Sequence, residues 1–178
     1  MSGTDYLGKV KGERSFLERL MGYIPGYHGY KEKELRRESD RLVRMEAVNR
    51  LRTAKTSIRR AFANPVMVQK LSQEDAYRYD ALNSRLDRIT QRVDRAVAGY
   101  AGMFDAVKVK EDKLDTVIQH DVSLIEKADA IKADCDKIAG MQPGNSDWGA
   151  AMDTLISKVE EYDTLIDERS QVLRGLAA

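Results

Sequence analysis

The chain has 178 residues, a formal net charge of +1 and 33% charged residues. This length suits one domain with a hydrophobic core and is short for two. One cysteine excludes an internal disulfide, no secretory leader is recognisable, and no apolar run reaches the roughly 20 residues that a membrane-spanning helix needs. We therefore expect a cytoplasmic protein with one folded unit.

The first predicted element is a short amphipathic helix in the stretch "SFLERLMGYI", residues 15 to 24. Five apolar residues recur at helical spacing on one face of this stretch: Phe16, Leu17, Leu20, Met21 and Ile24. Pro25 and Gly26 end it. Residues 1–29 thus comprise a flexible start, this helix and a turn rich in Pro, Gly and Tyr, and residues 30–178 are expected to form a single helical domain.

Three longer helical segments follow. Residues 31–62 contain no Gly or Pro. From Ser72, which can cap a helix through the backbone of Asp75, small or apolar residues step by three and four from Tyr79 to Ile138, and only Lys110 and Asp121 interrupt them. The same step resumes beyond Asn145, from Trp148 to Leu176. These patterns predict an all-α protein, and a polar residue on a seam, such as Asp121, is typical of a register-fixing position.

The sequence leaves open whether residues 73–139 form one helix, about 100 Å long at 1.5 Å per residue, or two. Gly99 and Gly102 favour a break, since each costs about 1 kcal/mol relative to Ala within a helix. The absence of Pro and the unbroken heptad phase favour continuity, which we prefer. A continuous helix gives an elongated antiparallel coiled coil, and a turn gives a four-helix bundle.

Residues with recognisable chemistry are few. Neither His28 nor His120 has a Glu three residues before it, as a di-iron bundle site requires. Cys135 lies between Asp134 and Asp136, whose charges disfavour a thiolate, so we interpret it as a buried core residue. Phosphate-binding loops, dinucleotide-binding fingerprints and nucleophile elbows are absent from the sequence. We predict a protein that is not an enzyme, with no catalytic residue, cofactor or metal.

Charge is distributed unevenly along the chain. Residues 31–60 hold eleven Lys or Arg against five Asp or Glu, whereas residues 147–178 hold three against seven. Four arginines of the basic segment are candidate contacts for a nucleic acid or an anionic lipid: Arg36, Arg37, Arg41 and Arg44. However, the cations surround the helix and alternate with acidic residues, so we favour a solvated face that also docks against the acidic helices.

The N-terminal amphipathic helix and the following turn form the candidate partner surface. It comprises Phe16, Leu17, Leu20, Met21, Ile24, Tyr27 and Tyr30. This surface either packs over one end of the bundle or inserts into a partner's groove or a membrane. The tyrosines of the turn, in the same way, either seal the bundle or bind a partner.

The stretch "IPGYHGYKEKELRRESDRLVR", residues 24 to 44, resembles the opening of a group of bacterial and archaeal all-helical proteins of no known activity. These share an Ile-Pro-Gly-Tyr-x-Gly-Tyr turn before a charged helix. The resemblance covers about a fifth of the chain and implies a prokaryotic origin. The order of short amphipathic helix, proline break and long charged helices is also similar to that of phage-shock and thylakoid-vesicle membrane-remodelling proteins, without a shared motif.

Together, these observations predict a non-enzymatic helical scaffold or adaptor that acts through protein contacts and self-associates through its heptad seams. A peripheral membrane protein that uses residues 13–24 is the second hypothesis. Nucleic-acid binding through residues 31–60 is the third.

Overall fold

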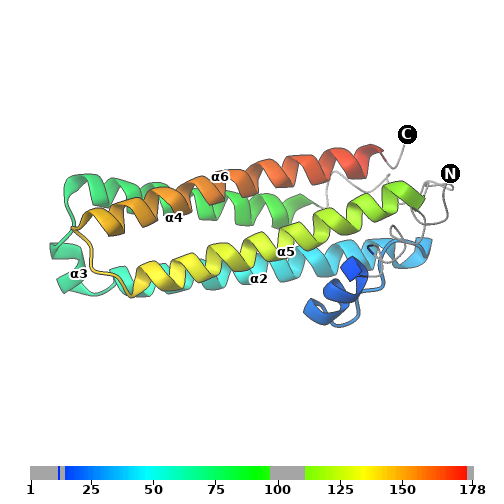
Figure 1. The fold of residues 1–178 in the computed structure, drawn as a ribbon, viewed down its shortest axis with the longest axis horizontal. Coiled ribbons are helices and arrows are strands. Elements are labelled where there is room, and N and C mark those ends of the chain that lie inside the picture. Colours follow the sequence, from blue (N-terminus) through cyan, green and yellow to red (C-terminus); the bar gives the residue numbers. More distant parts are fainter. Residues whose placement is uncertain (1–11, 13–14, 97–110, 176–178) are drawn as a thin grey trace.

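The computed structural model describes residue 12, residues 15–96 and residues 111–175. Every regular element in these ranges is a helix (Figure 1). A helix over residues 15–23 comes first. The elements that follow are η1 (Lys33–Leu35), α2 (Arg36–Phe62), α3 (Pro65–Gln69), α4 (Gln73–Arg95), α5 (Glu111–Ala139) and α6 (Ser146–Gly175). The predicted all-α class is confirmed. The predicted flexible start lies outside the described residues, apart from residue 12.

The four long helices form a bundle in which successive helices run in opposite directions (Figure 1). α2 packs against α5 and α4, and α6 packs against α5 and α4. The order around the bundle is therefore α2, α4, α6, α5. As a result, α2 and α5 are parallel neighbours, and α4 and α5, which follow each other in the chain, occupy opposite corners.

The preferred continuous helix over residues 73–139 is wrong. α4 ends at Arg95 with Ala96 as its C-cap, and α5 begins at Glu111 on the opposite corner of the bundle. A heptad pattern records which face of a segment is apolar, and a chain that folds back keeps both apolar faces inside one core. Gly99 and Gly102, which favoured a break, lie outside the described residues.

The apolar stripes predicted from the sequence form the core. α4 buries Leu82, Leu86, Ile89 and Val93, and the apolar stripes of α5 and α6 face the same core. At the end of the bundle that carries α3, the core finishes in three aromatic residues. The Phe62 ring stacks on Tyr79 with 4.0 Å between ring centroids and lies 5.9 Å from Trp148. This cluster anchors the end of the bundle.

Side-chain caps begin the helices near this end. The Ser72 hydroxyl accepts a hydrogen bond from the Asp75 amide at 3.0 Å, as predicted, and the Asp75 carboxylate bonds to Arg78. Asn64 caps α3 by accepting from the Val66 amide at 3.0 Å, and Asn145 accepts from the Trp148 amide at 2.7 Å. Such caps satisfy amide groups that a helix leaves unpaired at its start. Among the described helices, none is both long enough and apolar enough to cross a membrane.

Candidate functional site

The turn after the N-terminal helix is held rigidly against the bundle. Gly26 and Gly29 have φ angles of +83° and +74°, which L side chains rarely adopt. The Ser39 hydroxyl donates to the Gly29 carbonyl at 2.7 Å, and the Arg36 Nε donates to the Tyr30 carbonyl at 2.8 Å. Residues of early α2 therefore fix the backbone of the turn that precedes them.

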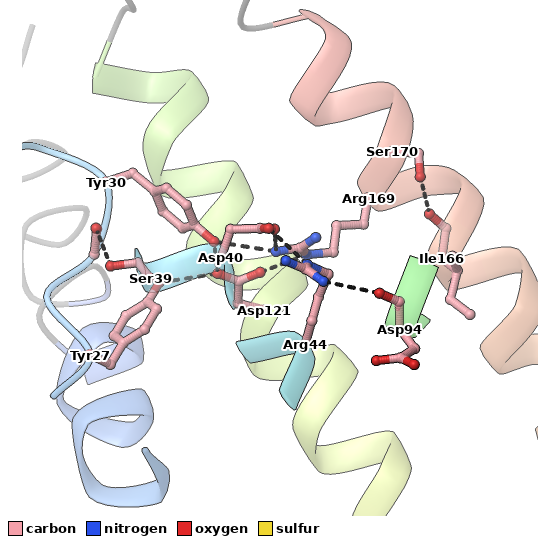
Figure 2. Close-up of polar contacts among 11 residues, drawn as sticks. Tyr27, Tyr30, Ser39, Asp40, Arg44, Asp94, Asp121, Ile166, Arg169 and Ser170 are labelled. Atoms are coloured by element: carbon pink, nitrogen blue, oxygen red, sulfur yellow. Dashed lines mark hydrogen bonds and ion pairs between the residues drawn. The ribbon is translucent and has the colours of Figure 1, made fainter. Parts of the chain in front are cut away.

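The turn directs two tyrosines into the protein interior, where both meet Asp121 of α5 (Figure 2). The Asp121 Oδ2 accepts a hydrogen bond from Tyr30 at 2.6 Å and another from Tyr27 at 3.1 Å. The Asp121 Oδ1 accepts from the Nε of Arg169 at 2.8 Å. Both oxygens of this buried carboxylate thus have partners, which come from the turn and from α6.

Arg169 extends the network across the bundle to α2, the helix at the corner opposite α6 (Figure 2). Its terminal nitrogen donates to the Asp40 Oδ1 at 2.8 Å and to the Tyr30 hydroxyl at 3.3 Å. The Asp40 Oδ2 accepts from the Arg44 Nε at 2.8 Å, and Arg44 also reaches the Asp94 carbonyl at the end of α4. The network therefore joins all four long helices. Two guanidinium groups balance two carboxylates within it.

Burial is the largest influence on the pKa values of Asp121, Tyr27 and Tyr30. It raises the pKa of Asp121 above its usual value, although the Arg169 charge and the Tyr30 hydrogen bond oppose that rise. Burial also raises the pKa values of Tyr27 and Tyr30, and the charge of Asp121 adds to both shifts. Burial alone would lower the pKa of Arg169, but Asp121, Tyr30 and Asp40 outweigh it and hold the guanidinium charged.

The network has structural rather than catalytic geometry. A cavity of about 10 Å³ beside Arg44 and Arg169 has room for about one water molecule and none for a substrate. Every carboxylate oxygen of Asp40 and Asp121 already accepts a hydrogen bond from a neighbouring side chain. We therefore interpret the cluster as the joint that fixes the turn against α2, α5 and α6.

The four candidate anion contacts do not form a free cationic patch. Arg36 and Arg44 are buried and serve the turn and the network. Arg41 forms an ion pair with Glu38 at 2.7 Å, and Arg37 also has a polar partner. Two of the acidic residues that alternate with these arginines in the sequence neutralise them: Glu38 pairs with Arg41, and Asp40 pairs with Arg44.

Most of the candidate partner surface lies inside the protein. Four of its residues are buried, and Phe16 and Leu17 pack against the core, which leaves Met21 exposed; the buried four are Leu20, Ile24, Tyr27 and Tyr30. The helix over residues 15–23 is held by contacts to α5 and α2. Tyr23 donates to Glu126 at 3.2 Å, and the Arg50 guanidinium lies 5.3 Å from the Tyr23 ring centroid. In this structure the segment covers the bundle and presents few apolar side chains to a partner.

Charge pairing is densest between α4 and α6. Four arginines of α4 meet carboxylates of α6 in the pairs Arg78–Asp153, Arg85–Glu160, Arg88–Asp163 and Arg92–Asp167. The basic α2 pairs with acidic residues on α5 and α4, through Arg50–Asp129 and Lys55–Asp87. Among the ion pairs of the described residues, the predicted attraction between the basic α2 and the acidic helices is represented by Arg50–Asp129, whereas the carboxylates of α6 pair with arginines of α4, a source of cations that was not predicted.

Two surface features were not predicted from the sequence. α3, with the sequence PVMVQ, has no buried residue, and Val66 and Val68 are 57% and 49% exposed. A groove of about 820 Å³ lies between the second half of α2 and the end of α5, near Arg52 and Arg60. The apolar run of α3 was visible in the sequence, but its exposure depends on how the helix ends meet. The groove depends on the packing of α2 and α5.

The residues considered for thiol and metal chemistry do not form a metal site within the described ranges. Cys135 is buried, and burial, followed by the charges of Asp136 and Asp134, raises its thiol pKa to about 12, so the thiolate is disfavoured. Within residues 15–96 and 111–175, no group of three or more His, Cys, Asp or Glu side chains is placed to hold a metal ion.

Comparison of the chain with protein-family models, with curated proteins and with solved structures gives no match. The resemblance carried by residues 24–44 therefore stays a prediction, and any function has to be argued from the surface and the interior of this bundle.

Proposed function

We propose that the chain is a non-enzymatic helical adaptor that binds a protein partner through the end of the bundle that carries α3. The observation that carries this proposal is the exposure of α3. A short apolar helix in a globular protein normally buries its apolar side chains, yet no residue of α3 is buried. Tyr77, one turn into α4, is 76% exposed near the same end. Exposed apolar side chains on a short element at the end of a bundle are typical of interaction sites.

The bundle supports this end as a rigid platform. Pro65 and the Asn64 cap fix the start of α3, and the stacked rings of Phe62 and Tyr79 lie beneath the helix ends. A surface held in one conformation loses little entropy when a partner binds. The geometry thus favours recognition of a partner by a preformed surface.

The charges around α3 indicate an acidic partner rather than a second copy. The chain carries no Asp or Glu between Glu46 and Glu74, and along the sequence Arg59 and Arg60 precede α3 while Lys70 follows it. Two copies that met through α3 would bring these cations together, which is unfavourable. The heptad seams, through which self-association was predicted, are buried within one chain. We therefore propose a different protein with an acidic rim as the partner.

The experiment replaces Val68 with a photoreactive amino acid in cells that produce the chain, and compares it with the same replacement at Met45, an exposed apolar position on α2. We expect one saturable protein adduct at position 68 that is absent at position 45. Val66→Ser, tested with the crosslinker at position 68, should reduce that adduct while leaving the free energy of unfolding within about 0.5 kcal/mol.

The same adducts at both positions would contradict the proposal. So would flotation of the wild-type chain with anionic vesicles that is lost in Val66→Ser with Val68→Ser, because that result assigns α3 to a membrane surface.

A further inference from the structure

The groove between α2 and α5 exists because small side chains meet there. Ser57, Ala61 and Ala139 leave the two helix surfaces apart, and the remaining lining is polar: Asn49, Arg52, Thr53, Thr56, Arg60 and Asp136. Its volume of about 820 Å³ is within the range of small-molecule sites. The groove lies along the side of the bundle, away from the buried network.

Cations in the groove are weakly neutralised. The nearest carboxylate to Arg52 is that of Asp94, 3.8 Å away, and both side chains are about 60% exposed, at 63% and 60%. An exposed pair at this distance contributes little. For Arg60, the described part of the chain shows no ion pair. By contrast, Arg50 and Lys55 turn away from the groove toward Asp129 and Asp87. The groove therefore holds one guanidinium group without a described ion pair, Arg60, and one in a long, exposed pair, Arg52, which a more strongly charged ligand can draw away from Asp94.

The single carboxylate in the lining is already engaged. Lys132 donates to Asp136 at 2.9 Å, and the hydrogen bond from Ser57, followed by that from Lys132, lowers the pKa of Asp136. The hydroxyls of Thr53 and Thr56 donate to carbonyls of their own helix. Donors for a ligand thus come from Arg52, Arg60 and the Asn49 amide. A lining of this kind selects an anion that carries many acceptors.

Arginine spacing indicates the shape of that anion. Arg52 and Arg60 are eight residues apart on one helix, which corresponds to about 12 Å at 1.5 Å per residue. A guanidinium group binds phosphate oxygens in a planar, bidentate manner. A single phosphate can engage one of the two arginines, whereas a chain of phosphates can approach both.

We propose that the groove between α2 and α5 binds a linear phosphate-bearing ligand, with Arg52 and Arg60 contacting separate phosphate groups and Asn49 donating between them. This proposal concerns another surface and another class of ligand than the partner site on α3, and Arg60 is the one residue that both arguments use.

Calorimetric titration of the full chain with inorganic tripolyphosphate at low ionic strength tests the site. We expect Arg52→Gln with Arg60→Gln to weaken binding at least tenfold. The matched control is Arg85→Gln with Arg88→Gln, which removes the same charge from exposed arginines of α4 and should change affinity less than twofold. Orthophosphate should bind more weakly than tripolyphosphate. Equal losses in the two double variants would overturn the proposal, because binding would then follow net charge alone.

A second variant tests the groove without a change of charge. Thr56 is exposed and lines the groove, so Thr56→Trp should block the groove without changing the fold. Circular dichroism checks that the variant is folded. Unchanged affinity in folded Thr56→Trp would also overturn the proposal.

A short single-stranded oligonucleotide distinguishes the source of the phosphates. Tighter binding than tripolyphosphate, with the same loss in Arg52→Gln with Arg60→Gln, supports the site and assigns it to a nucleic-acid strand.

Discussion

The Nε of Arg169 on α6 lies 2.8 Å from the Oδ1 of Asp121 on α5, and neither side chain has more than 4% of its surface exposed. The charges of a buried pair lose their hydration, and this cost offsets much of their attraction. The pair is nevertheless accompanied by Tyr30, Tyr27 and a second pair, Asp40 with Arg44. Removal of one member therefore leaves a buried charge without its partner.

Arg169→Met is expected to lower the free energy of unfolding by about 3–5 kcal/mol, the cost of an unpaired buried charge. Urea denaturation at pH 7 measures this loss. Arg85→Met, which breaks an exposed pair with Glu160, is the control and should cost about 1 kcal/mol or less. Adding Asp121→Leu to Arg169→Met should recover part of the loss. A cost below about 1 kcal/mol for Arg169→Met would contradict the role assigned to the network.

Stability should fall above pH 10. Burial, followed by the charge of Asp121, raises the pKa values of Tyr27 and Tyr30 above the ordinary 10.0. The unfolded chain then loses protons that the native chain retains, so the stabilisation is complete below pH 10 and decreases as pH rises further. The slope is up to about 1.4 kcal/mol per pH unit for each tyrosine. Urea denaturation at intervals from pH 8 to 11 measures it.

Tyr30→Phe should reduce this alkaline slope by one tyrosine and also lose the 2.6 Å bond to Asp121, at a cost of about 1.5–3 kcal/mol at pH 7. Tyr77→Phe, at an exposed position, is the control. The same slope in Tyr30→Phe and in the wild type would show that this tyrosine is not responsible.

Leu86→Ala should cost about 2–5 kcal/mol, because Leu86 is fully buried in the core. The loss should be the same at every protein concentration, since the seam that contains Leu86 is completed by helices of the same chain. Denaturation at low and high micromolar chain concentration checks both points. A denaturation midpoint that rises with chain concentration would instead support self-association through the seams.

Gly29→Ala should lower the free energy of unfolding by about 1–2 kcal/mol, because φ is +74° and the added Cβ would lie 3.3 Å from Leu17. Gly22→Ala provides the opposite case. Gly22 is helical with no heavy atom within 4 Å of the added Cβ, so the change should stabilise the protein by up to about 1 kcal/mol. Thermal unfolding of both variants measures the contrast, and equal effects would argue against a strained turn at Gly29.

Much of the fold follows from the apolar periodicity. The positions from Leu82 to Val93 were predicted as an internal stripe, and they are buried. Ser72 was predicted as a cap, and it caps α4. These features depend on local spacing and hydrogen bonding, which a single sequence records. The break between α4 and α5 was missed because a continuous heptad phase is compatible with a straight chain and with one that folds back.

The candidate site was visible in the sequence only in part. Asp121 and Arg169 each interrupt an apolar seam, and that interruption is the signal that they meet something polar inside. Their pairing was not predictable, because it depends on α5 and α6 being antiparallel neighbours. The tyrosines of the turn were predicted as part of the candidate partner surface, with sealing of the bundle as the alternative. The structure places Tyr27 and Tyr30 inside, where they seal it.

The span of the polar network also has a consequence during synthesis of the chain. Tyr30 and Arg169 are 139 residues apart, and Arg169 lies close to the end of the last helix. A chain still on the ribosome can form α2, α4 and α5 before Arg169 has left the exit tunnel. Until then the Asp121 carboxylate has no guanidinium partner and favours hydration over burial. The turn that carries the tyrosines is therefore expected to close last, after Arg169 has emerged from the tunnel.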